Sequence, residues 1–487
     1  MDRLLPELLL ALSLLAVAGN AAQHGPIKKA NWEAACMMAG ETRKIQALGA
    51  HNIATAAEAT LSYIKQALKT MIGIEVNRAG EYTREETALI AYYAAKADDA
   101  ATSLHSENIG KQTNAIAAAA RLDGRIVEFV NMAAKIADAD TRSCLAEGAD
   151  NTFRPSSTEF TGAAAACKDS VAAVTPAADL PSKFTTTGYD GDNLKGPADV
   201  AGTAGSHGCA LTTGKNSNKI VNQGGATNAA AKPAFAGGLF EWTTNQLQNT
   251  DLQTLSTTEA SYPTLYQAHK AYLTVKEDVK AYTTPTPATL KADPKMQELY
   301  KVHVIGQPPD NVKSVSGIES KIEAAYKQGD ELAKKYDKDF AETNVYNPNK
   351  AEPKAVKLAD LHTLQELITV LLHHRHDNQQ KLKDKITELQ KTINKSTDKT
   401  PEQICNAIGD KNESKCNTTK RCVYKEDGEK DKKCTLSEEA KQKAEKETEK
   451  DRDTGGGAGD TTGCSRHGID KEKCENKKQA INRIMHL

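Results

Sequence analysis

The sequence is poor in aromatic residues and has no excess of either charge. Aromatic side chains make up 5% of the 487 residues, and 63 basic residues stand against 64 acidic ones, for a net charge of −1. A nucleic-acid-binding surface needs an excess of lysine and arginine, so no nucleic acid is expected as a partner. The apolar content rests largely on alanine, which favours closely packed helices over a thick globular core.

Motifs of enzymes and metal sites are also missing. No C-x-x-C pair and no G-x-S-x-G turn occurs. Residues 208–215 are similar to a phosphate-binding loop, but they hold one residue too many between the glycines, and Asn216 stands where a magnesium-binding Ser or Thr belongs. His373 and His376 have helical i, i+3 spacing, with His374 between them, but no carboxylate stands in a catalytic relation to them. We interpret them as surface or packing residues and expect no enzyme activity, no cofactor and no metal site.

The N-terminus indicates an exported protein. Arg3 precedes an apolar run at residues 8–18, and small residues follow at 19–22. The run is shorter than the ~20 residues that span a bilayer, and its small-residue exit is typical of a cleaved signal peptide. A buried N-terminal helix is the alternative. We predict a signal peptide over residues 1–22, and no other stretch is apolar enough to cross a membrane.

Export makes the cysteines candidates for disulfides. They form two groups, which are separated by nearly two hundred residues without cysteine. Four cysteines allow three pairings, so the connectivity within a group stays open. The first group is Cys36, Cys144, Cys167 and Cys209; the second is Cys405, Cys416, Cys422, Cys434, Cys464 and Cys474.

Two long helices are predicted in the first third of the chain. Residues 31–78 contain no proline and carry a heptad seam of small and then larger apolar residues. Gly80 can end this helix in the left-handed conformation, and residues 83–86 form a capping box that starts a second helix, which runs to about residue 137. The phase of its apolar positions changes near Gly110. Two long helices joined by a tight turn must lie antiparallel, and their lengths favour a coiled-coil hairpin over a globular bundle.

The rest of the chain is predicted to form a loop-rich lobe, shorter helices and a third long helix. Residues 150–251 are rich in small and polar residues and must pack against the hairpin to be stable. Residues 255–282 and 312–340 are predicted to be helical again. A third long helix over residues 354–395 has heptad character and is expected to return along the hairpin as a third rod. The predicted fold is therefore mainly α, with an elongated helical N-terminal domain over residues 23–395.

A polar linker at residues 396–403 precedes a cysteine-rich C-terminal domain at residues 404–487. The C-terminal domain opens with four cysteines in 30 residues and has little apolar content there, so disulfides take the place of an apolar core. We expect these four cysteines to pair among themselves. A second cysteine module follows a glycine-rich joint at residues 455–459, and with only Cys464 and Cys474 we expect it to be incomplete. The N-x-[ST] sequons of an exported chain are candidate glycan sites, and they are Asn394, Asn412 and Asn417.

Together these features resemble the variant surface glycoproteins of African trypanosomes, with an N-terminal domain of class A. The match is carried by the signal peptide, the helix start at residues 31–36, the alanine-rich hairpin, residues 144–146 at its end, and the C-terminal cysteine module with its sequons. The resemblance implies pairing of Cys36 with Cys167 and of Cys144 with Cys209.

The resemblance also implies a function and partners. It implies a homodimer whose long helices associate along their length, held on the outer face of the plasma membrane by a glycosylphosphatidylinositol (GPI) anchor. A dense coat of such rods would shield the membrane from host antibodies, and exposed loops would vary between coat proteins. Related surface receptors and serum-resistance proteins, which bind a host macromolecule, are the alternative. The residues at 475–487 contain no apolar tail of the kind that precedes GPI attachment, so the expected anchor signal is absent from this stretch.

Overall fold

The computed structural model describes residues 24–442, apart from 171–172, 192, 204–207, 213–232, 244–245, 327–331, 333, 349–354 and 398–399. The predicted signal peptide, Cys464, Cys474 and the second cysteine module lie outside the described residues. The chain divides into two compact units, Met1–Asn378 and Gln379–Leu487. No helix in the part of the chain that the structure describes has both the length and the apolar character to cross a bilayer.

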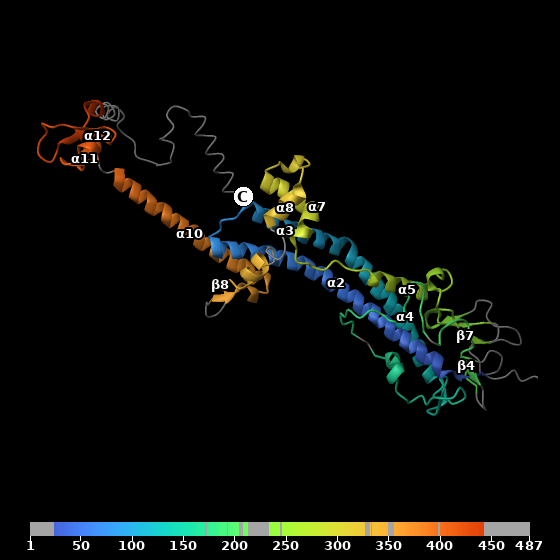
Figure 1. The fold of residues 1–487 in the computed structure, drawn as a ribbon. Helices are drawn as coiled ribbons and strands as arrows, with labels where there is room; N and C mark the ends of the chain where they lie inside the picture. Colours follow the sequence, from blue (N-terminus) through green and yellow to red (C-terminus); the bar gives the residue numbers. More distant parts are fainter. Residues whose placement is uncertain are drawn as a thin grey trace, which may run out of the picture. The chain divides into compact units, whose positions relative to one another are not determined.

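A long helical hairpin forms the frame of the first unit (Figure 1). Helix α2 (Lys29–Arg78) contains 50 residues, which corresponds to about 75 Å at 1.5 Å per residue. It ends at Ala79, whose left-handed conformation (φ 51°) lets its N–H reach the carbonyl of Ile74. After a short turn, α3 (Arg84–Ser103) runs back antiparallel to α2 and continues as α4 (Ile109–Lys135). The predicted hairpin is therefore confirmed.

A π-helical turn, η1 (Leu104–Asn108), joins α3 to α4. A π turn inserts one extra residue into a helix and rotates everything that follows. This turn lies next to Gly110, where the apolar pattern of the sequence changes phase. The rotation lets α3 and α4 each present a buried face toward α2, although the two faces have different phases in the sequence.

Two apolar clusters cover opposite ends of the hairpin. The first combines the start of α2 with α4 and the loop-rich lobe, with Trp32, Ile126, Phe129 and Trp242 among its buried members. This end of the hairpin also carries helix α5 and short strands: β1 pairs with β4, β2 pairs with β3, and β5, β6 and β7 form one sheet in that order. Their bounds are β1 (His24–Ile27), β2 (Ala137–Ala139), β3 (Arg142–Ser143), β4 (Ala201–Thr203), β5 (Ala234–Phe235), β6 (Phe240–Trp242), β7 (Leu247–Asn249) and α5 (Pro263–Lys276).

The second cluster surrounds the hairpin turn. It packs the end of α2 and the start of α3 against a group of short elements from residues 287–371. Gly73 of α2 is part of this contact, because a Cβ atom there would lie 2.3 Å from the ring of Phe340. The elements are α6 (Pro287–Ala292), α7 (Pro294–Tyr300), η5 (Lys301–Ile305), α8 (Ile318–Tyr326), η7 (Lys334–Asp339), β8 (Asn344–Tyr346) and β9 (Ala355–Lys357).

The third long helix, α10, extends over Leu364–Thr397, so its predicted start at residue 354 is wrong. Residues Ala355–Lys357 instead form β9, which pairs antiparallel with β8. Thr363 caps α10: its hydroxyl accepts a hydrogen bond from the N–H of Glu366, and the Glu366 carboxylate accepts one from the N–H of Thr363. The strand pairing and this cap together move the helix start by ten residues.

Packing of α10 against the hairpin can be described only as far as Asn378, where the first unit ends. Only its first two turns are buried, through Leu367, Val370 and Leu371. Further along, the apolar side chains of its heptad pattern are exposed.

The second unit contains the remainder of α10 and a small module. The module consists of α11 (Pro401–Asn406), α12 (Glu413–Thr418), and the antiparallel strands β10 (Cys422–Tyr424) and β11 (Cys434–Leu436). Its apolar cluster consists largely of cysteines and Leu436. Such a small core is what the low apolar content of this stretch allows.

Candidate functional site

A cavity in the first unit offers no recognisable catalytic arrangement. It has a volume of about 780 Å³ and lies between α2, the region around η1 and the segment at residues 277–283. Its charged lining residues include Lys96, Asp99, Glu107 and Lys111, so the lining carries both signs of charge. Nowhere in the described ranges do three or more His, Cys, Asp or Glu side chains gather in a way that could hold a metal ion.

The histidines of α10 pack against the β8 strand. The ring of His373 lies 4.6 Å from that of Tyr346, and its Nε2 atom lies 3.6 Å from a carboxylate oxygen of Asp377. The backbone N–H of Tyr346 donates a hydrogen bond of 3.2 Å to Nε2 of His374, while His376 is exposed. His373 and His374 therefore contribute to packing at the start of α10.

Two disulfides lie within the first apolar cluster. Cys36 of α2 is joined to Cys167, at the end of the short helix η2 (Gly162–Cys167), and Cys144 is joined to Cys209. All four cysteines are buried. The first bridge therefore ties the start of α2 to a loop that follows the hairpin, and the second closes a loop within the lobe.

A buried arginine beside Trp32 of α2 was not identified from the sequence. Arg154 is only 4% exposed, and its guanidinium lies 4.4 Å from the ring of Phe160 and 5.6 Å from that of Trp32. Burial lowers the pKa of Arg154, and the charges of Glu147 and Glu33 oppose this shift. The indole N–H of Trp32 donates a hydrogen bond of 2.9 Å to the carbonyl of Ala146. This bond fixes the orientation of the indole ring that faces Arg154.

At the opposite end, the hairpin turn is organised by a buried carboxylate. Glu86 is 1% exposed and serves as the third residue of the predicted capping box, where it accepts a hydrogen bond from the N–H of Thr83. It also pairs with Arg78 and accepts hydrogen bonds of 3.1 Å from Lys335 and Tyr336. This single carboxylate therefore links the end of α2, the start of α3 and the segment η7.

The electrostatics of Glu86 follow from this arrangement. Burial by itself raises the pKa of Glu86, but hydrogen bonds from Arg78, Thr83 and Lys335 outweigh burial and lower the pKa below its ordinary value. Burial, together with the charge of Glu86, raises the pKa of Tyr336 above its ordinary value. Glu86 is therefore ionised, and Tyr336 is neutral and donates to it, at neutral pH.

Replacing Thr83 by alanine tests the local part of this cap. We expect a loss of about 1 kcal/mol in the free energy of unfolding, because the N–H of Glu86 loses its acceptor. Urea unfolding followed by circular dichroism measures the change. Thr87→Ala is the matched control, since its exposed hydroxyl only back-bonds to the carbonyl of Thr83. Equal losses in the two variants would contradict a capping role.

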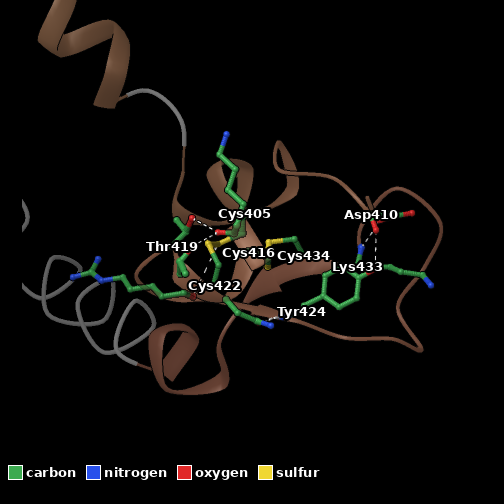
Figure 2. Close-up of a disulfide and its surroundings, with 12 residues drawn as sticks. Cys405, Asp410, Cys416, Thr419, Cys422, Tyr424, Lys433 and Cys434 are labelled. Atoms are coloured by element: carbon green, nitrogen blue, oxygen red, sulfur yellow. Dashed lines mark hydrogen bonds between the residues drawn. A yellow bond between two sulfur atoms is a disulfide. The ribbon is translucent and has the colours of Figure 1, made fainter. Parts of the chain in front are cut away.

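The C-terminal module is held by two crossed bridges (Figure 2). Cys405 is joined to Cys422, and Cys416 is joined to Cys434. Each bridge connects one of the short helices to one strand of the β10–β11 hairpin. Every cysteine of the described residues is part of a disulfide.

Asp410 orders the loops of this module. Its carboxylate accepts hydrogen bonds from the backbone N–H groups of Lys433, at 2.8 Å, and Asp431, and these bonds lower the pKa of Asp410 below its ordinary value. The hydroxyl of Tyr424 donates to the Asp410 carbonyl at 2.7 Å. The loop between α11 and α12 is thereby fastened to β10 and to the loop before β11, as Figure 2 shows.

Two of the three sequons lie on the surface of the same module. Asn412 is exposed directly before α12. Asn417 is exposed within α12, and its Oδ1 accepts a hydrogen bond from the N–H of Tyr424, which orients Nδ2, the atom to which a glycan attaches. Asn394 belongs to α10, and its side chain is outside the described residues.

Comparison with known proteins gives matches over both units. The family model of the trypanosome variant surface glycoprotein (A-type) matches residues 8–375, and that of the trypanosome variant surface glycoprotein C-terminal domain matches residues 405–484. Variant surface glycoprotein MITAT 1.2 of Trypanosoma brucei brucei is 24% identical over 472 residues, which cover 95% of this chain and 94% of that protein. MITAT 1.6 of the same organism is 23% identical over 461 residues, which cover 87% of this chain and 83% of that protein.

The fold has a counterpart among solved structures. The structure of MITat 1.1 aligns with a TM-score of 0.59 and 20% sequence identity, and the alignment covers 76% of this chain and all of that one. The A-type family model alone matches well over half of this sequence. This chain therefore belongs to the trypanosome variant surface glycoprotein family, with an A-type N-terminal region and the C-terminal domain of the family.

Proposed function

We propose that this chain is a coat protein that shields the parasite plasma membrane from host antibodies, through dense packing and antigenic variation. The observation that carries the proposal is the division of the first unit into a buried helical frame and exposed loops. The frame is held by an apolar cluster at each end of the hairpin and by the Glu86 contacts at its turn.

The loop-rich lobe supports the antigenic part of the proposal. Residues 168–183 are largely exposed, apart from the gap at 171–172, and few of their side chains enter the apolar cluster. Substitutions at such positions change the surface that an antibody contacts and leave the packing of the frame unaltered. Host antibodies are the partners that this surface would meet as an antigen.

The remaining properties belong to the same proposal. We propose a homodimer through the long helices, attachment to the outer face of the plasma membrane through a GPI anchor, and glycans at Asn394, Asn412 and Asn417. The pairs Cys36–Cys167 and Cys144–Cys209, and those within the C-terminal module, would be oxidised in the exported protein. Peptide mapping by mass spectrometry under non-reducing conditions, with and without glycosidase treatment, tests the bridges and the glycans.

The coat function is tested by making this chain the only coat protein of a trypanosome line. Flow cytometry then measures the binding of an antibody against an invariant membrane protein. We expect little binding while the coat is intact and strong binding after phospholipase C treatment, which cleaves GPI anchors. Free antibody access on untreated cells, or a low copy number together with tight binding of a host serum protein, would contradict a coat and favour the receptor alternative.

A further inference from the structure

The second unit carries an apolar stripe that no described residue covers. Leu382, Ile386 and Leu389 lie on α10 at successive steps of four and three residues and are 58%, 47% and 62% exposed. Side chains at these steps lie on one face of a helix. Single exposed leucines are ordinary, but three on one face of one helix form a seam that indicates a partner.

The residue types on the stripe specify the kind of partner. In heptad terms, Ile386 occupies position a, and Leu382 and Leu389 occupy position d. A β-branched residue at a with leucine at d favours a parallel, two-stranded coiled coil. We propose that residues 382–389 of α10 form such a coiled coil with the same residues of a second copy of this chain.

The flanking charges are compatible with this arrangement. In a parallel pair, each g position lies next to the e position of the following heptad of the partner helix. Lys385 at g then faces Gln390 of the second copy. The preceding g residue, Asn378, is uncharged, and its amide already donates to the carbonyl and the carboxylate of Glu75 in α2. Neither g position therefore places a like charge beside a lysine of the second copy, so the basic residues beside the stripe do not oppose the pairing.

The size of the stripe limits its role. Three side chains from each copy cover less than the roughly 1,000 Å² of a stable stand-alone interface. The inference therefore rests on the dimer proposed above: the long helices of the first unit provide most of the association, and the α10 seam adds to it. The seam would also hold the two C-terminal modules close together.

Sedimentation equilibrium of the full-length mature protein tests the seam. The variant carries Leu382→Ser, Ile386→Ser and Leu389→Ser, and the matched control carries Asp384→Ser, Thr387→Ser and Lys391→Ser on the other faces of the same segment. All six side chains are exposed, so the fold of the chain is preserved. We expect the dimer dissociation constant to rise about tenfold or more in the first variant, since six aliphatic side chains lose their contact, and to stay unchanged in the control.

Photo-crosslinking tests the parallel orientation. A benzophenone side chain in place of Leu382 should crosslink to the region of residue 382 in the second copy, and one in place of Leu389 to the region of residue 389. An exchanged pattern, or crosslinks to residues 443–487 of the same chain, would overturn the proposal. Unchanged dissociation of the triple serine variant would overturn the seam but leave the hairpin dimer standing, whereas a monomeric wild-type chain would refute both.

Discussion

Replacing Glu86 by alanine should lower the free energy of unfolding of the first unit by roughly 2–4 kcal/mol. The carboxylate is buried and accepts hydrogen bonds from Lys335, Tyr336 and the N–H of Thr83. Its removal leaves the buried hydroxyl of Tyr336 without this acceptor. Arg78 and Lys335 are partly exposed, so water can solvate them, and this keeps the loss below that of a fully buried ion pair.

Urea unfolding at neutral pH measures this loss, and Glu85→Ala is the matched control. Glu85 is the neighbouring acidic residue in the first turn of α3 and provides only its backbone carbonyl to Tyr326. We expect the control to lose a few tenths of a kcal/mol from its favourable position at the helix N-terminus. A comparable loss in both variants would show that the charge near the helix start, rather than the buried network, stabilises the turn.

The stability difference between wild type and Glu86→Ala should depend on pH. Because the pKa of Glu86 is lowered in the folded chain from its ordinary value of 4.5, the unfolded chain binds more protons in the acid range. The contribution of Glu86 is therefore fully present above pH 4.5 and disappears as the pH falls through its folded pKa. Unfolding curves between pH 7 and pH 3 should converge for the two proteins, and a constant difference would contradict the ionised network.

Removing the bridge between Cys36 and Cys167, by Cys36→Ser with Cys167→Ser, should cost about 3–5 kcal/mol. The two cysteines are 131 residues apart, and a bridge that closes a long loop restricts the unfolded chain strongly. Both sulfurs lie in the first apolar cluster, so the serine hydroxyls would also be buried. Thermal unfolding followed by circular dichroism measures the effect on the first unit.

The matched control is Cys405→Ser with Cys422→Ser, which removes a bridge of 17 residues in the second unit. We expect the unfolding midpoint of the first unit to stay unchanged in this control, because its cysteines pack only within the C-terminal module. Limited proteolysis should instead cleave the C-terminal module sooner. An unaltered midpoint of the first unit in the Cys36 and Cys167 variant would show that the apolar cluster holds the start of α2 without the bridge.

Much of the helical frame could be predicted because its signals are local. The heptad seam of α2, the left-handed end at Ala79 and Gly80, and the capping box at Thr83 and Glu86 each depend on residues within a few turns. The third long helix was recognised for the same reason. Its start was predicted ten residues too early, because residues 355–357 pair with β8, and neither strand has a pattern that reveals the pairing.

The sequence by itself therefore determined the antiparallel hairpin, the helical class and the cysteine-rich module, since helix periodicity, caps and residue composition act over short distances. Only the tertiary structure decided which polar and apolar groups meet. Glu86 contacts Tyr336, which is 250 residues away in the sequence, and Arg154 lies against Trp32 and Phe160. The apolar stripe of α10, at Leu382, Ile386 and Leu389, is exposed. Burial and pairing between distant segments depend on the path of the whole chain, and no local pattern records that path.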